Sequence, residues 1–81
     1  MTEEQFDKLN KMKVGRALRY LRKSKGLTCQ QLADMTSTQK YWISNVENAK
    51  SNFQFSMLIR VMYVLGVTID EFTEYMDSPI H

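Results

Sequence analysis

The chain contains few of the residues that cross-link or interrupt a small fold. One cysteine, one proline, one histidine and three glycines occur in 81 residues. A single cysteine excludes an intramolecular disulfide, and one cysteine with one histidine makes no zinc-ligand cluster, so we expect no metal and no other cofactor. No apolar run approaches the ~18 residues of a membrane span, and the acidic N-terminus lacks the apolar core of a signal peptide. We therefore expect a cytoplasmic protein.

The composition that remains is typical of one small globular domain. Hydrophobic residues make up 43% and charged residues 25% of the chain, which indicates a folded protein and excludes a disordered one. A chain of 81 residues supports one modest core, so we expect a single domain over 1–81. Because glycine and proline are scarce and no alternating strand pattern has useful length, the sequence predicts an all-α fold.

Charge is distributed unevenly along the chain. Residues 1–52 contain ten Lys/Arg and five Asp/Glu, a net charge of +5, whereas residues 53–81 contain one Lys/Arg and four Asp/Glu, a net charge of −3. A polyanion would be attracted to the first part. The same basic residues also suit the solvated face of a first helix, so charge alone leaves both interpretations open.

Apolar spacing and helix-end signals predict five helices, at about 12–24, 28–35, 39–47, 55–65 and 69–76. Gly26 and Gly66 stand where the first and fourth helices should end. The fourth helix is expected to turn five apolar residues inward: Phe55, Leu58, Ile59, Met62 and Leu65.

Two capping boxes are predicted from the spacing of threonine and glutamine. Thr28 and Gln31 have this spacing at the start of the second helix, and Thr2 and Gln5 repeat it near the N-terminus. Residues 2–11 therefore either extend the first helix or precede it. The sequence leaves three alternatives for this N-terminal extension: a helix, an arm that contacts DNA, or a part of the dimer interface.

The segment 28–47 predicts two short helices joined by a tight polar turn. Ile43 and Val46 take inward positions on the second of these helices. Four other residues then share its outer face: Lys40, Tyr41, Ser44 and Asn45. A face rich in hydrogen-bonding groups and poor in apolar surface suits the base edges of a DNA major groove. The pattern predicts a helix-turn-helix DNA-binding domain.

Motifs spread along the chain support this prediction as a set. They are Val14-Gly15-x-x-Leu18-Arg19-x-Leu21-Arg22, Lys25-Gly26-Leu27-Thr28, Gln31-Leu32-Ala33, Ile43-Ser44-x-Val46-Glu47-Asn48-x-Lys50 and Leu65-Gly66-Val67-x-Ile69-x-Glu71-Phe72. With these residues the chain resembles the Cro and phage-repressor helix-turn-helix family, the XRE-like regulators, over residues 14–72. The resemblance implies a compact five-helix bundle of the lambda-repressor type, with residues 39–47 as the recognition helix.

The resemblance also implies roles for individual residues. Base contacts would come from the start and middle of the recognition helix: Gln39, Lys40, Tyr41, Ser44 and Asn45. Phosphate contacts would come from the second helix, the turn and the loop after the third helix: Thr28, Gln30, Thr38, Lys50 and Asn52. The family also pairs an arginine late in the first helix with a glutamate late in the third, here Arg22 and Glu47.

Four positions depart from the family pattern. Ser37 replaces the usual turn glycine, so it must take a left-handed conformation at some cost or the turn must differ. Cys29 replaces a phosphate-binding glutamine, for which Gln30 is the available substitute. Ala49 and Phe53 replace a glycine and a proline around the loop after the third helix. These changes concern the phosphate contacts and leave the expected fold intact.

The predicted function is that of a sequence-specific, double-stranded-DNA-binding transcriptional regulator, a repressor that binds a palindromic operator as a homodimer. The expected dimer surface is the last helix with the end of the fourth, where Phe72, Tyr75 and Met76 would be exposed apolar contacts. The alternative is an antitoxin or another module that uses the same fold to bind a small protein such as a toxin. A weaker third possibility is a scaffold that has lost DNA binding. No nucleophile–base pair or phosphate-cradling glycine loop is present, so we do not expect an enzyme.

Two residues of the helix-turn-helix keep two interpretations each. Trp42 either packs toward the fourth helix or lies along a sugar-phosphate strand with its N–H donating, and the usual burial of large aromatics favours packing. Cys29 stands at the start of a helix and is either a redox switch or, as we prefer, an inert small residue.

Overall fold

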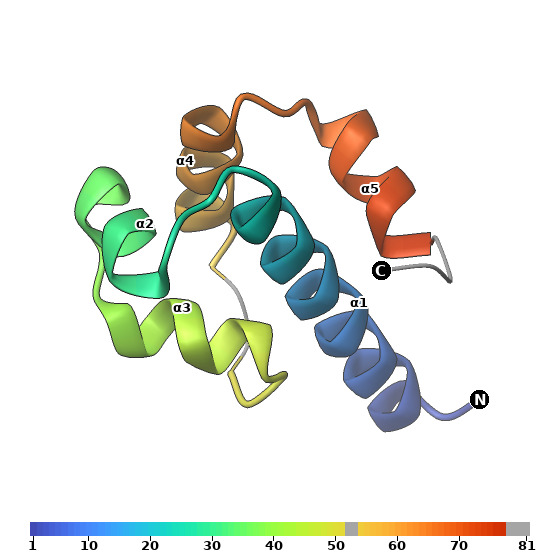
Figure 1. Cartoon of the computed structure of the whole chain (residues 1–81). Helices are drawn as coiled ribbons and strands as arrows, with labels where there is room; N and C mark the ends of the chain where they lie inside the picture. Colours follow the sequence, from blue (N-terminus) through green and yellow to red (C-terminus); the bar gives the residue numbers. More distant parts are fainter. Residues whose placement is uncertain (52–53, 78–81) are drawn as a thin grey trace.

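The computed structural model describes residues 1–51 and 54–77, which form five helices and no strand. The helices are α1 (Glu3–Ser24), α2 (Cys29–Thr36), α3 (Lys40–Glu47), α4 (Phe55–Leu65) and α5 (Ile69–Asp77), shown in Figure 1. The predicted all-α architecture is confirmed, and the last four helices begin and end within about one residue of the expected positions. Within the described ranges, no helix is long and apolar enough to cross a membrane.

The first helix is longer than its apolar stripe indicated. Thr2 is its N-cap: the Gln5 backbone N–H donates to Thr2 Oγ1 (3.1 Å), and the Thr2 backbone N–H donates to Gln5 Oε1 (3.0 Å). This reciprocal pair satisfies two free backbone donors at the helix start. Residues 3–11 are therefore the first turns of α1, which settles their secondary structure.

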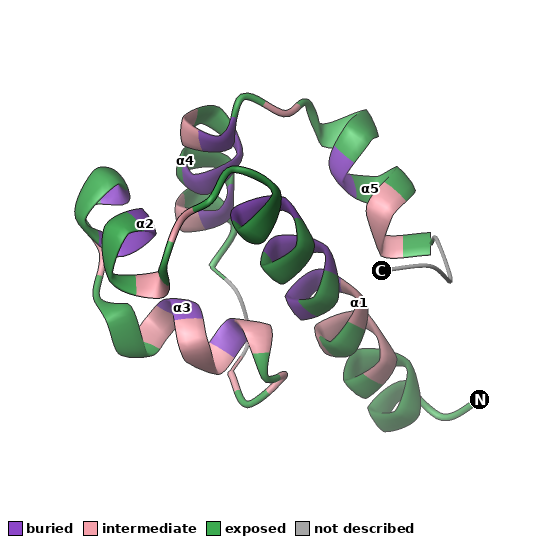
Figure 2. Ribbon diagram, in the orientation of Figure 1, coloured by how far each residue is buried: buried purple, intermediate pink, exposed green. Residues whose placement is uncertain are grey.

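α1 runs through the middle of the fold, with α3 on one side and α5 on the other (Figure 1). α2 packs against α3 and α4. Figure 2 shows that the buried residues line the inward faces of all five helices, whereas the first turns of α1 are mostly exposed. The buried apolar core consists of Val14, Ala17, Leu18, Leu21, Leu32, Ala33, Ile43, Val46, Leu58, Val61, Met62, Leu65 and Phe72.

The orientation predicted for α4 was partly wrong. Leu58, Met62 and Leu65 are buried as expected, but Phe55 is 65% exposed and Ile59 is 37% exposed. The core instead takes Val61, which is fully buried. α4 is apolar over most of its circumference, so its sequence allows two adjacent stripes, and packing selects the one at 58, 61, 62 and 65.

The exposure predicted for α5 was also partly wrong. Phe72 is 2% exposed and belongs to the core, so it is not available for a dimer contact. Tyr75 and Met76 are half-buried and pack against the core. The Tyr75 ring lies 5.0 Å, centroid to centroid, from the ring of Tyr20 on α1. The inner face of α5 thus fixes this helix to α1 within one chain.

The connection between α2 and α3 is a tight left-handed turn. Ser37 has φ 56° and ψ 40°, so of the two outcomes left open by the sequence, a left-handed serine or a different turn, the structure has the left-handed serine. Its backbone N–H donates to the carbonyl of Asp34 (3.4 Å), and that of Thr38 donates to the carbonyl of Ala33 (2.9 Å), which closes the end of α2. Ala49, after α3, also has a positive φ of 59°.

Candidate nucleic-acid interface

The scaffold holds α3 close against α1. Ile43 and Val46 are buried on the inner side of α3. On α1, Gly15 lies so near the end of α3 that an added Cβ would stand 2.8 Å from the carbonyl oxygen of Glu47 and closer still to that of Val46. Only a residue without a side chain allows this approach, so Gly15 sets the distance between the two helices.

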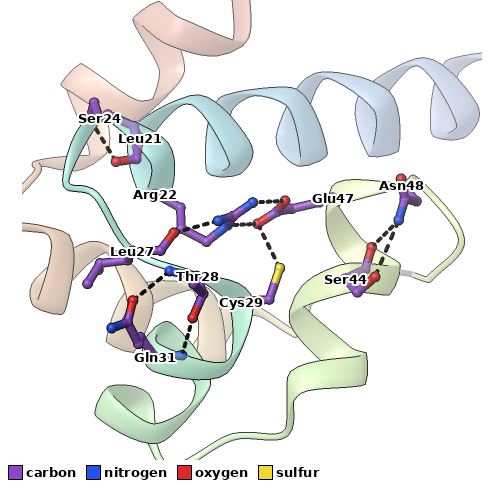
Figure 3. Close-up of polar contacts among 10 residues, drawn as sticks. All are labelled: Leu21, Arg22, Ser24, Leu27, Thr28, Cys29, Gln31, Ser44, Glu47 and Asn48. Atoms are coloured by element: carbon purple, nitrogen blue, oxygen red, sulfur yellow. Dashed lines mark hydrogen bonds and ion pairs between the residues drawn. The ribbon is translucent and has the colours of Figure 1, made fainter.

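A buried ion pair joins the same two helices (Figure 3). Arg22 Nε donates to Glu47 Oε2 (2.6 Å), and Arg22 Nη2 donates to Glu47 Oε1 (3.0 Å), so the contact is bidentate. The exposed fractions of the two side chains are 10% and 5%. The hydrogen bond to Glu47, and then its negative charge, raise the pKa of Arg22 above its ordinary value, although burial acts in the opposite direction. The pair therefore fixes α3 to α1 by directional, charge-assisted hydrogen bonds.

Arg22 and Glu47 also form hydrogen bonds with residues at the start of α2. Arg22 Nη1 donates to the carbonyl oxygen of Leu27, just before α2 begins (Figure 3). Cys29 is half-buried and its Sγ donates to Glu47 Oε2 at 3.9 Å. The thiol thus points toward the Arg22–Glu47 ion pair between α1 and α3. This position lies at the inner edge of the site and differs from the solvent-facing position expected of a phosphate-binding side chain.

A contact from α4 supports the turn, and the sequence pattern did not reveal it. Arg60 Nη1 donates to the carbonyl oxygen of Thr36, the last residue of α2, at 3.0 Å. The buried Thr36 hydroxyl donates to the carbonyl of Leu32 (2.8 Å) and lies 2.8 Å from the hydroxyl of Thr38. Arg60 is the single cation of residues 53–81, which was the one signal that could have singled it out.

The outer side of α3 brings the five candidate base-contacting residues together. Gln39, the N-cap, and the next two residues, Lys40 and Tyr41, are exposed. Ser44 and Asn45 are half-buried on the same side of the helix. The exposed Asn48 was not among the candidates, and its amide donates to the carbonyl of Ser44 (2.9 Å, Figure 3). The site is therefore a polar, convex helix face and contains one cation, Lys40.

Trp42 lies on the flank of α3, between the exposed and the buried residues. It is half-buried and packs against the hydrophobic core. The packing interpretation of this residue is supported, and a part of its surface stays exposed beside Tyr41.

The candidate phosphate-contacting residues lie around this face, at the start of α2, in the turn and after α3. Thr28 is the exposed N-cap of α2, and its Oγ1 accepts a hydrogen bond from the backbone N–H of Gln31 (3.0 Å, Figure 3). The exposed Gln30 donates its amide to Asp34 Oδ1 (2.8 Å). Thr38 is half-buried, and Lys50 is exposed in the loop after α3. Asn52 lies outside the described residues.

A capped short helix, a left-handed turn at Ser37 and a second short helix with a polar outer side together define a helix-turn-helix DNA-binding domain. The sequence profile of the helix-turn-helix domain family matches residues 13–74, and the chain belongs to this family. The resemblance to the XRE-like DNA-binding transcription regulators is thereby confirmed.

Individual relatives agree with this assignment. A competence pilus inhibition repressor from Acinetobacter baylyi is 49% identical over 47 residues, which are 58% of this chain and 43% of that protein, so the match covers less than half of its length. The restriction-modification controller protein C.Esp1396I, solved as a tetramer with its natural 35-base-pair operator, is 27% identical, with a TM-score of 0.74 over 82% of this chain and 87% of that one. The clp gene regulator ClgR from Corynebacterium glutamicum shares the fold at 24% identity, with a TM-score of 0.78 over 82% of this chain and 70% of its own.

Proposed function

We propose that this protein is a sequence-specific transcriptional repressor, and not an enzyme, that binds a palindromic operator in the cytoplasm as a homodimer. The observation that carries the proposal is the polar outer side of α3, which is exposed while a buried ion pair and a close backbone contact fix its inner side. A recognition helix needs this combination, because base readout requires free polar groups in a fixed position. A relative whose name describes it as a repressor supports the direction of regulation.

In this proposal α3 enters the major groove with its first residues at the base edges. Lys40 would donate to guanine O6 or N7, and Asn45 would bind adenine or a phosphate. Gln39, Tyr41 and Ser44 complete the contact surface.

Phosphate contacts would come from the residues that surround α3. Lys50 is exposed and has no ion-pair partner among the described residues, so it contributes a full positive charge. Thr28 and Gln30 stand at the first turn of α2, and Thr38 stands before α3. Asn52 completes the set expected from the sequence.

Homodimer formation would use the outer face of α4, in place of the Phe72 contact that the sequence predicted. Phe55, Ile59 and Tyr63 follow each other at intervals of four residues, so they share one side of α4, and Ile69 adds to them at the start of α5. We name these four residues the α4 apolar face. A hollow of about 260 Å³ adjoins three of these residues, Ile59, Tyr63 and Ile69, and is also lined by Met62 and Val67. Exposed apolar surface of this kind marks a protein interface.

In a two-fold dimer each copy would present one recognition helix, and the operator is expected to have half-site centres ~10 bp apart, which is one DNA turn. The toxin-binding alternative stays a prediction, and no feature of the described surface favours it over a second copy of this chain.

Selection of bound sequences from a random pool of duplex DNA tests the proposal. The selected sequence should be an imperfect palindrome, bound ~10³-fold or more tightly than a scrambled duplex. Asn45→Ala should relax the base preference. The control Lys50→Ala should weaken binding to all sequences about equally, and should lower the slope of log affinity against log salt concentration by ~1. Binding without sequence preference would overturn the proposal.

A further inference from the structure

Two stripes of opposite charge lie on the solvent-facing sides of α1 and α5. Arg16, Arg19 and Lys23 follow at intervals of three and four residues, so they share one side of α1, and all three are exposed. We name them the basic stripe. Asp70, Glu71 and Glu74 are exposed on α5, and we name them the acidic stripe. Neither stripe has a part in the proposed DNA contacts.

Helix geometry places both stripes on the same surface of the molecule. On α1, Leu18 and Leu21 point into the core and Tyr20 meets α5, which leaves the basic stripe on the outer side. On α5, Phe72 points into the core and Tyr75 meets α1, which leaves the acidic stripe on the outer side as well. The Tyr20–Tyr75 contact therefore forms a seam with positive charge on one side and negative charge on the other.

The two stripes do not neutralise each other within one chain. Among residues 1–51 and 54–77, a single ion pair joins α1 to α5, between Lys13 Nζ and Asp77 Oδ1 at 3.1 Å, and it involves neither stripe. The basic stripe also borders a hollow of about 440 Å³, lined by its three cations and Tyr20. Such a hollow can receive carboxylate side chains from another molecule.

We propose that this surface binds a second copy of the chain, with the two-fold axis along the Tyr20–Tyr75 seam. Rotation about that axis places the basic stripe of each copy on the acidic stripe of the other. The surface is self-complementary, as a two-fold contact requires. An axis perpendicular to the seam would instead bring like charges together, which is unfavourable. The charge pattern thus selects both the partner and its orientation.

This contact is separate from the DNA site and from the α4 apolar face. Figure 1 shows α3 and α5 on opposite sides of α1, so a copy bound along the seam leaves α3 accessible. Ile69, the α5 residue of the α4 apolar face, is about a quarter-turn or more from each residue of the acidic stripe. Two different self-contacts on one chain would join dimers into tetramers or longer rows.

Sedimentation equilibrium of the full chain at about 50 mM and about 500 mM sodium chloride tests the seam contact, because salt screens exposed charges and spares apolar contacts. The mass should fall at high salt to that of the species held by the α4 apolar face alone. Tyr63→Glu should remove the salt-resistant association and leave the salt-sensitive one, so failure of the α4 contact and failure of the seam contact give different results. An identical mass at both salt concentrations would overturn the proposal.

Charge exchange across the seam is the sharper test. Arg19→Glu and Glu74→Arg should each weaken salt-sensitive association about tenfold, while the two variants mixed should associate at least as well as the unmodified chain. Lys25→Glu is the matched control: it makes the same charge change outside the stripe, and association should stay within about twofold. If the mixture does not recover, or if Lys25→Glu weakens association equally, the seam contact is wrong.

Discussion

The two helices of the helix-turn-helix are equally long, eight residues each, but their first turns differ. α2 begins with a complete capping box, in which Thr28 and Gln31 exchange hydrogen bonds of 3.0 and 2.8 Å. α3 begins at Gln39, whose side chain makes no capping hydrogen bond. An eight-residue helix is too short to be stable alone, so α3 depends on its contacts with the rest of the fold.

The contacts that support α3 come from residues distant in sequence. Gly15 and Arg22 of α1 approach its end, and Arg60 of α4 holds the turn that precedes it. Because the scaffold supports α3, its first turn does not depend on a side-chain cap, and the Gln39 side chain makes no capping hydrogen bond. Local capping in α2 and distant support in α3 thus represent two different solutions for helices of equal length.

The largest loss of stability is expected when the Arg22–Glu47 ion pair is broken. Arg22→Ala leaves the Glu47 carboxylate buried without a partner, and should lower the free energy of unfolding by ~3–5 kcal/mol. Lys13→Ala is the control, since it breaks an exposed pair worth ~0–1 kcal/mol. Urea denaturation measures both, and equal losses would show that burial of the Arg22–Glu47 pair is unimportant.

A smaller loss is expected where α1 and α3 meet backbone to backbone. Gly15→Ala should destabilise the fold by ~1–3 kcal/mol, because the new methyl group must push α3 away. On an exposed helix site the same change would stabilise by up to ~1 kcal/mol. Ser56→Ala, on the exposed side of α4, is the control and should change stability little. A more stable Gly15→Ala variant would mean that the two helices separate easily.

Removal of the local cap tests the other side of the comparison. Thr28→Ala deletes the acceptor for the Gln31 N–H and should cost ~1 kcal/mol. Thr2→Ala removes the same type of cap from the exposed first turn of α1. Loss of this cap should fray only the end of the helix and leave the core folded, so the loss of stability should be smaller. Thermal unfolding of both variants gives the ranking, and the reverse order would contradict it.

The smallest effect is expected from adding a cap to α3. Gln39→Asp places a carboxylate at its positive end and should stabilise by ~0.5 kcal/mol. The same charge should weaken DNA binding, since it stands beside Lys40, which we propose to contact a base. Gln39→Ser adds a cap without charge, so the difference between the two variants in a DNA titration isolates electrostatic repulsion. Equal DNA affinities would remove position 39 from the interface.

Sequence reasoning succeeded where structure is local. The capping box at 28–31 and the helix end at Gly66 each follow from a few adjacent residues, and the structure shows both. For Ser37 the family resemblance left two outcomes open, and the structure has the left-handed one. The N-terminal cap of α1 is equally local, but it remained ambiguous because the following turns carry no complete apolar stripe. Local signals therefore gave the number and the order of the helices.

Sequence reasoning failed where distant residues decide. Phe55 and Val61 are both apolar and lie on adjacent sides of α4, and packing against α2 and the rest of the core decides which is buried. Phe72 looked available for a partner because its own core contacts are with residues far along the chain. The contact of Arg60 with Thr36 joins residues 24 positions apart, and no spacing rule reports it.

The position of Trp42 has a practical consequence. It is the only tryptophan of the chain, and it lies half-buried on α3, against the core and next to Tyr41. Its indole emission therefore reports optically on one event, the docking of α3 onto the scaffold, without any attached dye. During denaturation, a red shift of that emission before the loss of helical circular dichroism would show that α3 detaches from the core before the whole protein unfolds.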